Sequence, residues 1–259
     1  MFAVDHAATA LLIKRRYPSV PLAPMLVAVQ AMELAWVLLN YLGVERTSTE
    51  PVVRSVADIH LAYMPFSHSV LTAAGAAVLA WLVIEKGFGQ QFLGRAVGLG
   101  IISHLILDLL THAHDIVLWP GRPSPALGLG LYGAAPFGAF VLELAYGVFC
   151  WWVYRGARGL LALIIIGNVA NLSLLSPAVP GPEGLLAGRP IALVTVIFVQ
   201  IAVTLVLMGI LARQRAAQRY GSFTAALATV VRGPGDPAKP LRPRDPSRPA
   251  DPSAPLSHG

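Results

Sequence analysis

An apolar run from about residue 96 to residue 119 constrains the fold of this chain more than any other stretch. The run is long enough to cross a bilayer as an α-helix. At about 100° per residue, five of its polar side chains fall within roughly a third of the helix circumference. They are His104, Asp108, Thr111, His112 and Asp115. Because imidazoles and carboxylates in hydrocarbon cost several kcal/mol each without partners, this stripe needs a compensating cation, a water cavity or polar groups from other helices.

Two interpretations of this polar stripe follow. A His and an Asp four residues later, such as His104 and Asp108, can reach one divalent ion from adjacent turns of a helix. The alternative is a set of interhelical hydrogen bonds that fixes helix packing. One such residue alone would favour packing, whereas four imidazoles and carboxylates on one face favour a functional site.

The composition indicates a membrane protein. Hydrophobic residues make up 56% of the 259 residues and charged residues only 12%, whereas soluble domains carry about a quarter charged residues. We therefore predict an all-α fold, a polytopic transmembrane helix bundle. Cys150 is the only cysteine, which excludes an intramolecular disulfide and a Cys-based zinc site. We expect it to be a buried small hydrophobe.

Hydrophobic length and the Gly and Pro breakers predict about six spans. They cover residues 25–42, 66–84, 96–119, 136–154, 159–175 and 191–211. A polar loop is expected at residues 44–64. The first segment, residues 2–16, is too short to span and ends in the basic run Lys14-Arg15-Arg16. It is expected to form a short N-terminal re-entrant or interfacial helix.

The distribution of Lys and Arg predicts the orientation of the bundle. With six spans both termini share one side, which carries ten Lys and Arg residues before the tail, against four on the other side. Because positively charged loops stay in the cytoplasm, both termini are expected to be cytoplasmic in a bacterial inner membrane. Residues 1–220 form the predicted transmembrane domain. Residues 221–259, rich in Pro with Arg, Asp and Ser, are predicted to be a disordered cytoplasmic tail.

Polar groups of other segments are predicted to meet the stripe. Glu33 lies near the middle of the first span, and His68 occupies the first turn of the second within a Ser-His-Ser triplet. At about 1.5 Å per residue, Glu33 and Asp108 lie near the membrane centre. His68 and His112 lie roughly 6–12 Å toward the outer side. A re-entrant start of the chain would place His6 about 12 Å deep, close to the same region.

With these residues in place, the first part of the chain resembles the YdjM-type family of inner-membrane, metal-dependent hydrolase-like proteins. The family pattern is an early His, an acidic group on the second segment, a Thr/Ser-His-Ser element and a later His-x-x-x-Asp-x-x-Thr. The matching residues, within about residues 1–120, are His6, Glu33, Ser67-His68-Ser69, His104, Asp108 and Thr111. The chain departs from the pattern in two ways. It carries Met32-Glu33 in place of a Pro-Asp pair, and it lacks the Arg that often precedes the Thr-His-Ser element.

Residues and resemblance together predict a membrane-embedded, metal-dependent hydrolase acting on an ester or phosphodiester, with a lipid-derived substrate as the natural choice within a bilayer. Histidine and carboxylate ligands without thiolate suit Zn²⁺, with Mn²⁺ or Fe²⁺ as alternatives. The predicted metal ligands are His68, His104 and Asp108, with His6 and Glu33 completing the site or binding a second metal. His112 or Asp115 is predicted to carry protons or to orient a ligand.

Two other functions would use the same residues. A transporter or proton pathway would use Glu33, Asp108, Glu143 and the histidines as a relay, although the six predicted spans show no repeat of three plus three. A structural membrane protein would use these residues only for packing. The predicted partners are membrane lipid and a small-molecule or lipid-derived substrate, and no nucleic acid is expected.

Overall fold

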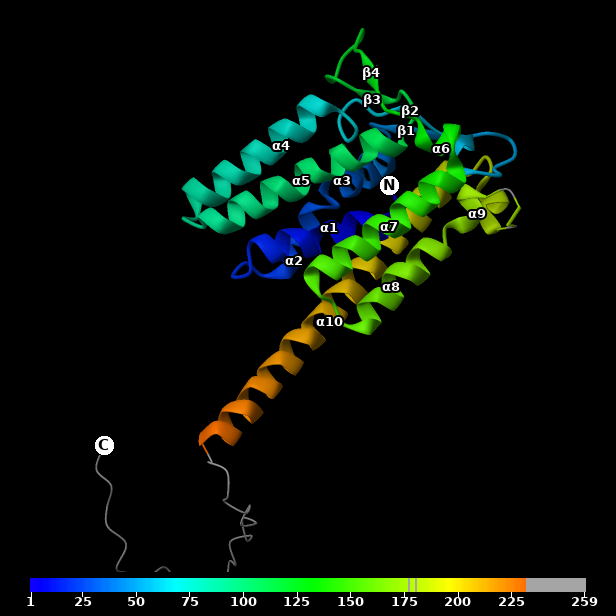
Figure 1. Ribbon diagram of the computed structural model, residues 1–259. Coiled ribbons are helices and arrows are strands. Elements are labelled where there is room, and N and C mark those ends of the chain that lie inside the picture. Colours follow the sequence, from blue (N-terminus) through cyan, green and yellow to red (C-terminus); the bar gives the residue numbers. More distant parts are fainter. Residues whose placement is uncertain (177, 180, 232–259) are drawn as a thin grey trace, which may run out of the picture. The chain divides into compact units, whose positions relative to one another are not determined.

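The computed structural model describes residues 1–176, 178–179 and 181–231, with only the helical backbone for residues 214–231. The chain divides into two units, Met1–Ala217 and Gln218–Gly259. The first unit carries the functional residues and consists of packed helices with two short β-hairpins (Figure 1). The predicted helical class is therefore confirmed, with the addition of a small amount of sheet.

The described residues form helices of very different lengths. The α-helices are α1 (Ala3–Arg16), α2 (Leu22–Ala28), α3 (Ala31–Tyr41), α4 (Val70–Leu82), α5 (Gln91–Thr111), α6 (Leu131–Ala134), α7 (Pro136–Tyr154), α8 (Arg158–Val169), α9 (Leu172–Leu175) and α10 (Pro190–Val231). Short 3-10 turns lie at Val56–Asp58 and Pro182–Leu186, and a π-helical turn at Val83–Gly87 extends α4. The antiparallel hairpins are β1 (Arg46–Thr49) with β2 (Ile59–Tyr63) and β3 (Ile116–Val117) with β4 (Ala126–Leu127).

Helix α1 is buried inside the first unit. It packs against α7 and α5 (Figure 1), and every residue from Ala3 to Leu11 is buried. Small side chains such as Ala7 and Ala8 allow this close approach. The helix predicted for the first residues of the chain therefore exists, and it lies in the core rather than along a surface.

Four helical segments are long and apolar enough to cross a membrane. They are Val70–Gly87, Gln91–Thr111, Pro136–Tyr154 and Pro190–Arg213. A fifth is added if α2 and α3, which bend by 53° at a short break, count as one span. The predicted number of six is not confirmed, because α8 has only 12 residues and a spanning helix needs about 20. The apolar helices support a membrane location, whereas the side of the termini stays a prediction.

Helices α4 and α5 form a hairpin that brings functional residues to one end. Their backbones approach closely at two glycines of α5. A Cβ added to Gly94 would lie 2.8 Å from the carbonyl oxygen of Trp81, and one added to Gly98 would lie 3.1 Å from that of Ala77. Because the two helices are antiparallel, the start of α4 and the last turns of α5 lie at the same end of the hairpin (Figure 1).

Helix α5 ends at Thr111, short of the predicted end at about residue 119. His112 has an extended backbone conformation, with a ψ of 151°. The prediction that His112 and Asp115 share the helical face of Asp108 is therefore wrong. Both residues lie on the loop that follows the helix.

Helix α5 ends where the loop that precedes α6 donates hydrogen bonds to carbonyl groups at the end of α5. The backbone N–H of Leu129 donates to the carbonyl of Leu109 at 2.8 Å. Gly128 makes this approach possible, since its φ is +138° and an added Cβ would lie 1.9 Å from the carbonyl oxygen of Ala113. The helix thus stops where a distant loop satisfies its free carbonyls, and hydrophobic periodicity does not reveal such a contact.

Two further predictions concern segments outside the bundle. The polar loop expected at residues 44–64 contains the β1–β2 hairpin, in which Ser48 pairs with His60. The domain boundary near residue 220 stays a prediction, because α10 continues to Val231. Most of the predicted Pro-rich tail, residues 232–259, lies outside the described residues.

Candidate metal centre

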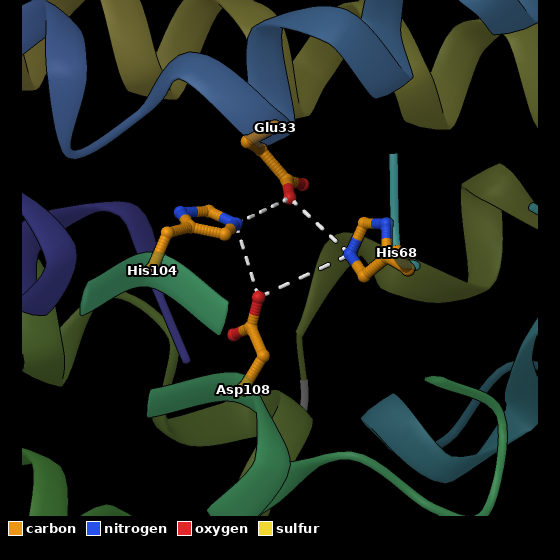
Figure 2. A group of neighbouring side chains, drawn as sticks. All are labelled: Glu33, His68, His104 and Asp108. Carbon is orange, nitrogen blue, oxygen red and sulfur yellow. Dashed lines mark ion pairs between the residues drawn. The ribbon is translucent and has the colours of Figure 1, made fainter. Parts of the chain in front are cut away.

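Four side chains from three segments converge near the end of the α4–α5 hairpin (Figure 2). They are Glu33 from α3, His68 from the turn before α4, and His104 and Asp108 from α5. One ligand atom from each lies within 4.8 Å of the other three. His68, His104 and Asp108 are almost fully buried, so their polarity has to be balanced inside the protein.

The ligand atoms form a closed ring of short separations (Figure 2). Oδ2 of Asp108 lies 3.0 Å from Nε2 of His104 and 4.0 Å from Nε2 of His68. Oε2 of Glu33 lies 3.6 Å and 3.7 Å from the same two nitrogens. Ligands about 2.1 Å from a tetrahedral zinc ion lie about 3.4 Å from one another. The separations observed here are of the size that one ion requires.

A backbone carbonyl determines which nitrogen of His104 faces the centre. Nδ1 lies 2.9 Å from the carbonyl oxygen of Val29, and because a carbonyl only accepts, Nδ1 carries the proton. In the neutral ring, Nε2 then directs a lone pair toward Glu33 and Asp108. Nε2 has no hydrogen-bond partner among the described residues despite its burial, which suits an atom placed to bind a cation.

A chain of buried groups orients His68 in the same way. Ser67 Oγ donates to Glu45 Oε2 at 2.5 Å and lies 2.9 Å from His68 Nδ1. Since the single hydroxyl proton goes to the carboxylate, Nδ1 of His68 is the donor to the hydroxyl oxygen. Glu45 also accepts the backbone N–H groups of Phe66 and Ser67, both at 2.9 Å. In metal sites, a carboxylate commonly orients a histidine through the ring nitrogen that does not bind the metal. Here Glu45 acts through Ser67 on Nδ1 of His68, and Nε2 faces the centre.

The centre therefore consists of acceptors that face one another. Two imidazole lone pairs and two carboxylate oxygens repel unless cations or protons lie between them. A divalent ion satisfies all four ligands at once. The donor set of two histidines and two carboxylates suits Zn²⁺, Mn²⁺ or Fe²⁺, so the residues fit the predicted metal.

Asp108 uses its second oxygen, Oδ1, for other partners. Nε2 of His6 lies 3.1 Å from this oxygen. The amino group of Met1 lies 2.6 Å from it and 2.9 Å from Oγ1 of Thr111. The ring of His6 also stacks on that of His104, with 3.9 Å between the ring centroids. His6 thus lies outside the group of four ligands and supports two of its members.

Comparison with known proteins matches the middle of the chain to one family. Residues 60–178 match the model of the YdjM inner membrane protein family. The match covers just under half of the 259 residues, and this part of the chain resembles the YdjM-type family. The predicted resemblance is therefore confirmed, although the match begins and ends later than the predicted residues 1–120. It includes His68, His104 and Asp108, whereas His6 and Glu33 precede it. No curated protein and no solved structure matches the chain.

His112 and Asp115 lie at the edge of the centre, although they are not on α5. Nε2 of His112 is 3.9 Å from Oδ1 of Asp108, and its Nδ1 is 3.4 Å from Oδ1 of Asp115. Both side chains are partly exposed, and both line the cavity beside the metal ligands. The structure thus brings both residues to the site, and their role in proton transfer stays a prediction.

Two further buried carboxylates belong to Asp5 of α1 and Glu143 of α7. Glu143 accepts the backbone N–H of Phe2 at 3.0 Å and the hydroxyl of Tyr132 at 2.7 Å. Oδ1 of Asp5 accepts the side-chain amide of Asn168 at 3.2 Å. Neither carboxylate belongs to a group of metal ligands among the described residues. Glu143 is therefore held by hydrogen bonds of its own and takes no part in the metal centre.

A cavity of about 730 Å³ lies beside the candidate metal ligands. The site residues that line it are His6, Glu33, His68, His112 and Asp115. Apolar side chains of α3, β2 and α10 form much of the remaining wall, among them Trp36, Leu61, Leu193, Val196, Ile197 and Val199. Pockets that bind small molecules measure about 300–1,000 Å³, so the cavity has the size of a substrate site.

Proposed function

We propose that this YdjM-type protein is a membrane-embedded, metal-dependent hydrolase that cleaves an ester or phosphodiester, with Zn²⁺ as the preferred ion. The observation that carries this proposal is the convergence of four acceptor ligands beside a cavity of substrate size. The chemistry is inferred from the ligand types and from the position of the cavity. The proposed location is the bacterial inner membrane, with several spans and both termini in the cytoplasm.

In this proposal the ion is held by Glu33, His68, His104 and Asp108. When bound, it would supply an acidified water as nucleophile and polarise the carbonyl or phosphoryl group under attack. The carbonyl of Val29 and the hydroxyl of Ser67 hold the two imidazoles in the tautomer that binds metal. These supports lie in the folded chain itself, so the ligands are arranged before an ion arrives.

His112 is the proposed proton carrier. It lines the cavity, and the carboxylate of Asp115 lies beside its Nδ1, where it would orient the ring and stabilise the imidazolium. When water adds to the ester carbon, one proton has to leave the water. When the bond to the leaving group breaks, one proton has to reach the departing oxygen. His112 accepts the first proton and delivers it to the departing oxygen, so that the ring returns to its neutral form.

The experiment is hydrolysis by detergent-purified protein, with 4-nitrophenyl acetate and bis(4-nitrophenyl) phosphate as probes. We expect hydrolysis of at least one probe, loss of activity on chelation and recovery with Zn²⁺. His112→Ala should lower kcat by a factor of about 10²–10⁴ without changing the metal content. His114→Ala is the matched control, because His114 is an exposed histidine on the same loop that does not line the cavity.

Two results would contradict the proposal. Metal-free protein whose stability does not change on chelation would show that the four acceptors share protons instead of an ion. Flux into proteoliposomes that depends on Asp108 but needs no divalent ion would favour a transporter.

A further inference from the structure

We infer that the substrate is an uncharged long-chain ester, whose apolar chain lies along α10 and whose head group carries no phosphate. This inference rests on the proposed hydrolase function and selects one of its two substrate classes. Three features of the cavity carry it, namely the length of its apolar wall, its contact with the membrane-facing side of α10 and its balance of charge.

The apolar wall begins at the metal ligands. Trp36 lies one turn after Glu33 on α3, is buried, and packs in one apolar cluster with Ile197 of α10. The cavity-lining residues of α10 extend from Leu193 to Val203, a distance of about 15 Å at 1.5 Å per residue. A wall of this length and composition fits a hydrocarbon chain better than a small polar substrate.

One face of α10 connects this wall with the surface of the bundle. Val196, Val199 and Val203 line the cavity, yet they are 51%, 52% and 50% exposed. Their spacing of three and four residues places them on one helix face. Since α10 is long and apolar enough to cross a membrane, this face borders the lipid tails. A chain dissolved in the bilayer can therefore reach the cavity without crossing water.

The balance of charge disfavours a phosphate group. No Lys or Arg side chain lines the cavity in the part of the chain that the structure describes. A divalent ion and the amino group of Met1 together carry three positive charges. The carboxylates of Glu33, Asp108 and Asp115 match them with three negative charges, and the buried Glu183 in the cavity wall adds a fourth. An anionic phosphodiester would thus lose its hydration without gaining a positive charge that the carboxylates leave uncompensated, whereas an uncharged ester loses little.

The same charge balance assists the release of product. Water adds to the acyl carbon, the bond between that carbon and the alkoxy oxygen breaks, and a carboxylic acid and an alcohol form. The acid gives its proton to water and becomes an anion in surroundings that already hold Asp115 and Glu183. Repulsion between these carboxylates favours its departure.

The first test measures binding without turnover. Chelated wild-type protein in detergent is incubated with monolauroylglycerol or with a lysophosphatidic acid of the same acyl chain, and bound lipid is counted by native mass spectrometry. We expect the neutral lipid to bind about tenfold more tightly. Val196→Trp should abolish this binding by filling the cavity, and Val199→Trp provides an independent second block. Val206→Trp is the matched control, because Val206 is a 60% exposed valine of α10 that does not line the cavity.

The second test measures turnover by the zinc-loaded protein. We expect lauroyl esters to be hydrolysed with a kcat/KM at least about tenfold above that of acetyl esters, and Val196→Trp to remove this preference without changing the metal content. Preferential cleavage of phosphodiesters, or equal rates for short and long esters, would overturn the inference and leave the hydrolase proposal intact. If no probe is hydrolysed in a metal-dependent way, the proposed function is refuted. The binding test would still decide whether the cavity binds a neutral lipid chain.

Discussion

Nδ1 of His104 lies 2.9 Å from the carbonyl oxygen of Val29, at the point where α2 and α3 meet with a bend of 53°. In a continuous helix that carbonyl would accept from the backbone four residues later. The break frees it to orient a metal ligand and places Glu33 in the first turn of α3. The side chain of Gln30 fixes the break by donating to the carbonyl of Ala3 at 2.7 Å. Irregular backbone of this kind is tolerated in a membrane only where protein or a cavity surrounds it.

Asp108→Asn tests whether the centre needs charge. The amide keeps the shape and one accepting oxygen but removes the negative charge that a cation requires. We expect the metal content to fall from about one equivalent per chain to near zero, as measured by inductively coupled plasma mass spectrometry. Ile106→Val on the exposed face of α5 is the control and should keep its metal. An Asp108→Asn protein with full metal content would mean that Asp108 serves packing only.

Glu45→Gln tests the support of His68. Glu45 is 1% exposed and holds Ser67, which in turn holds Nδ1 of His68. Loss of a group that orients a ligand typically costs about 10- to 100-fold in metal affinity. We expect that loss in a competition titration with a chromophoric chelator.

Glu50→Gln is the matched control for this titration. Glu50 also contacts a histidine, with 2.8 Å between its Oε1 and Nε2 of His60. Both of these side chains are about half exposed, and exposed ion pairs contribute at most about 1 kcal/mol. Glu50→Gln should therefore leave metal affinity unchanged, and equal losses in the two variants would show that the titration reports a general effect of charge.

The sequence was sufficient to predict the elements that periodicity and hydropathy determine. The span expected at residues 136–154 is α7, Pro136–Tyr154. The pair of His104 and Asp108 lies on one face of α5 with 3.0 Å between Nε2 and Oδ2, because helical spacing alone brings such residues together. The expectation that Glu33 and His68 reach the same centre also agrees with the structure.

Contacts between distant segments explain what the sequence did not reveal. Val29 acts through its carbonyl, which its side chain does not indicate, and no Gly or Pro marks the break after it. Glu45 lies in a loop, 22 residues before Ser67, whose hydroxyl donates a hydrogen bond to it. His112 leaves the helix because residues 128–130 bond to the end of α5, and no local signal in residues 112–119 predicts that end.

Gly128→Ala tests this helix end. A Cβ at Gly128 would overlap the carbonyl oxygen of Ala113, and its φ of +138° is strained for any L residue. Strain of this kind costs about 1–3 kcal/mol, so the thermal unfolding midpoint should fall by several degrees. Gly133→Ala is the control, since an added Cβ there has nothing within 4 Å. Equal midpoints for the two variants would show that the loop does not have to approach α5 this closely.

The orientation of α5 decides on which side of the membrane the metal centre opens. Gln90 and Ala126 are exposed positions that precede and follow α5, whose 21 residues span about 31 Å. Cys150 is fully buried and should give little background labelling.

With cytoplasmic termini, Ala126→Cys should react with a membrane-impermeant maleimide on intact cells, whereas Gln90→Cys should react only after permeabilisation. The reverse pattern would invert the topology, and labelling of both in intact cells would mean that α5 does not span. The expected pattern would place the β3–β4 hairpin and the adjoining metal centre on the outer side, which is the side that carries fewer Lys and Arg residues.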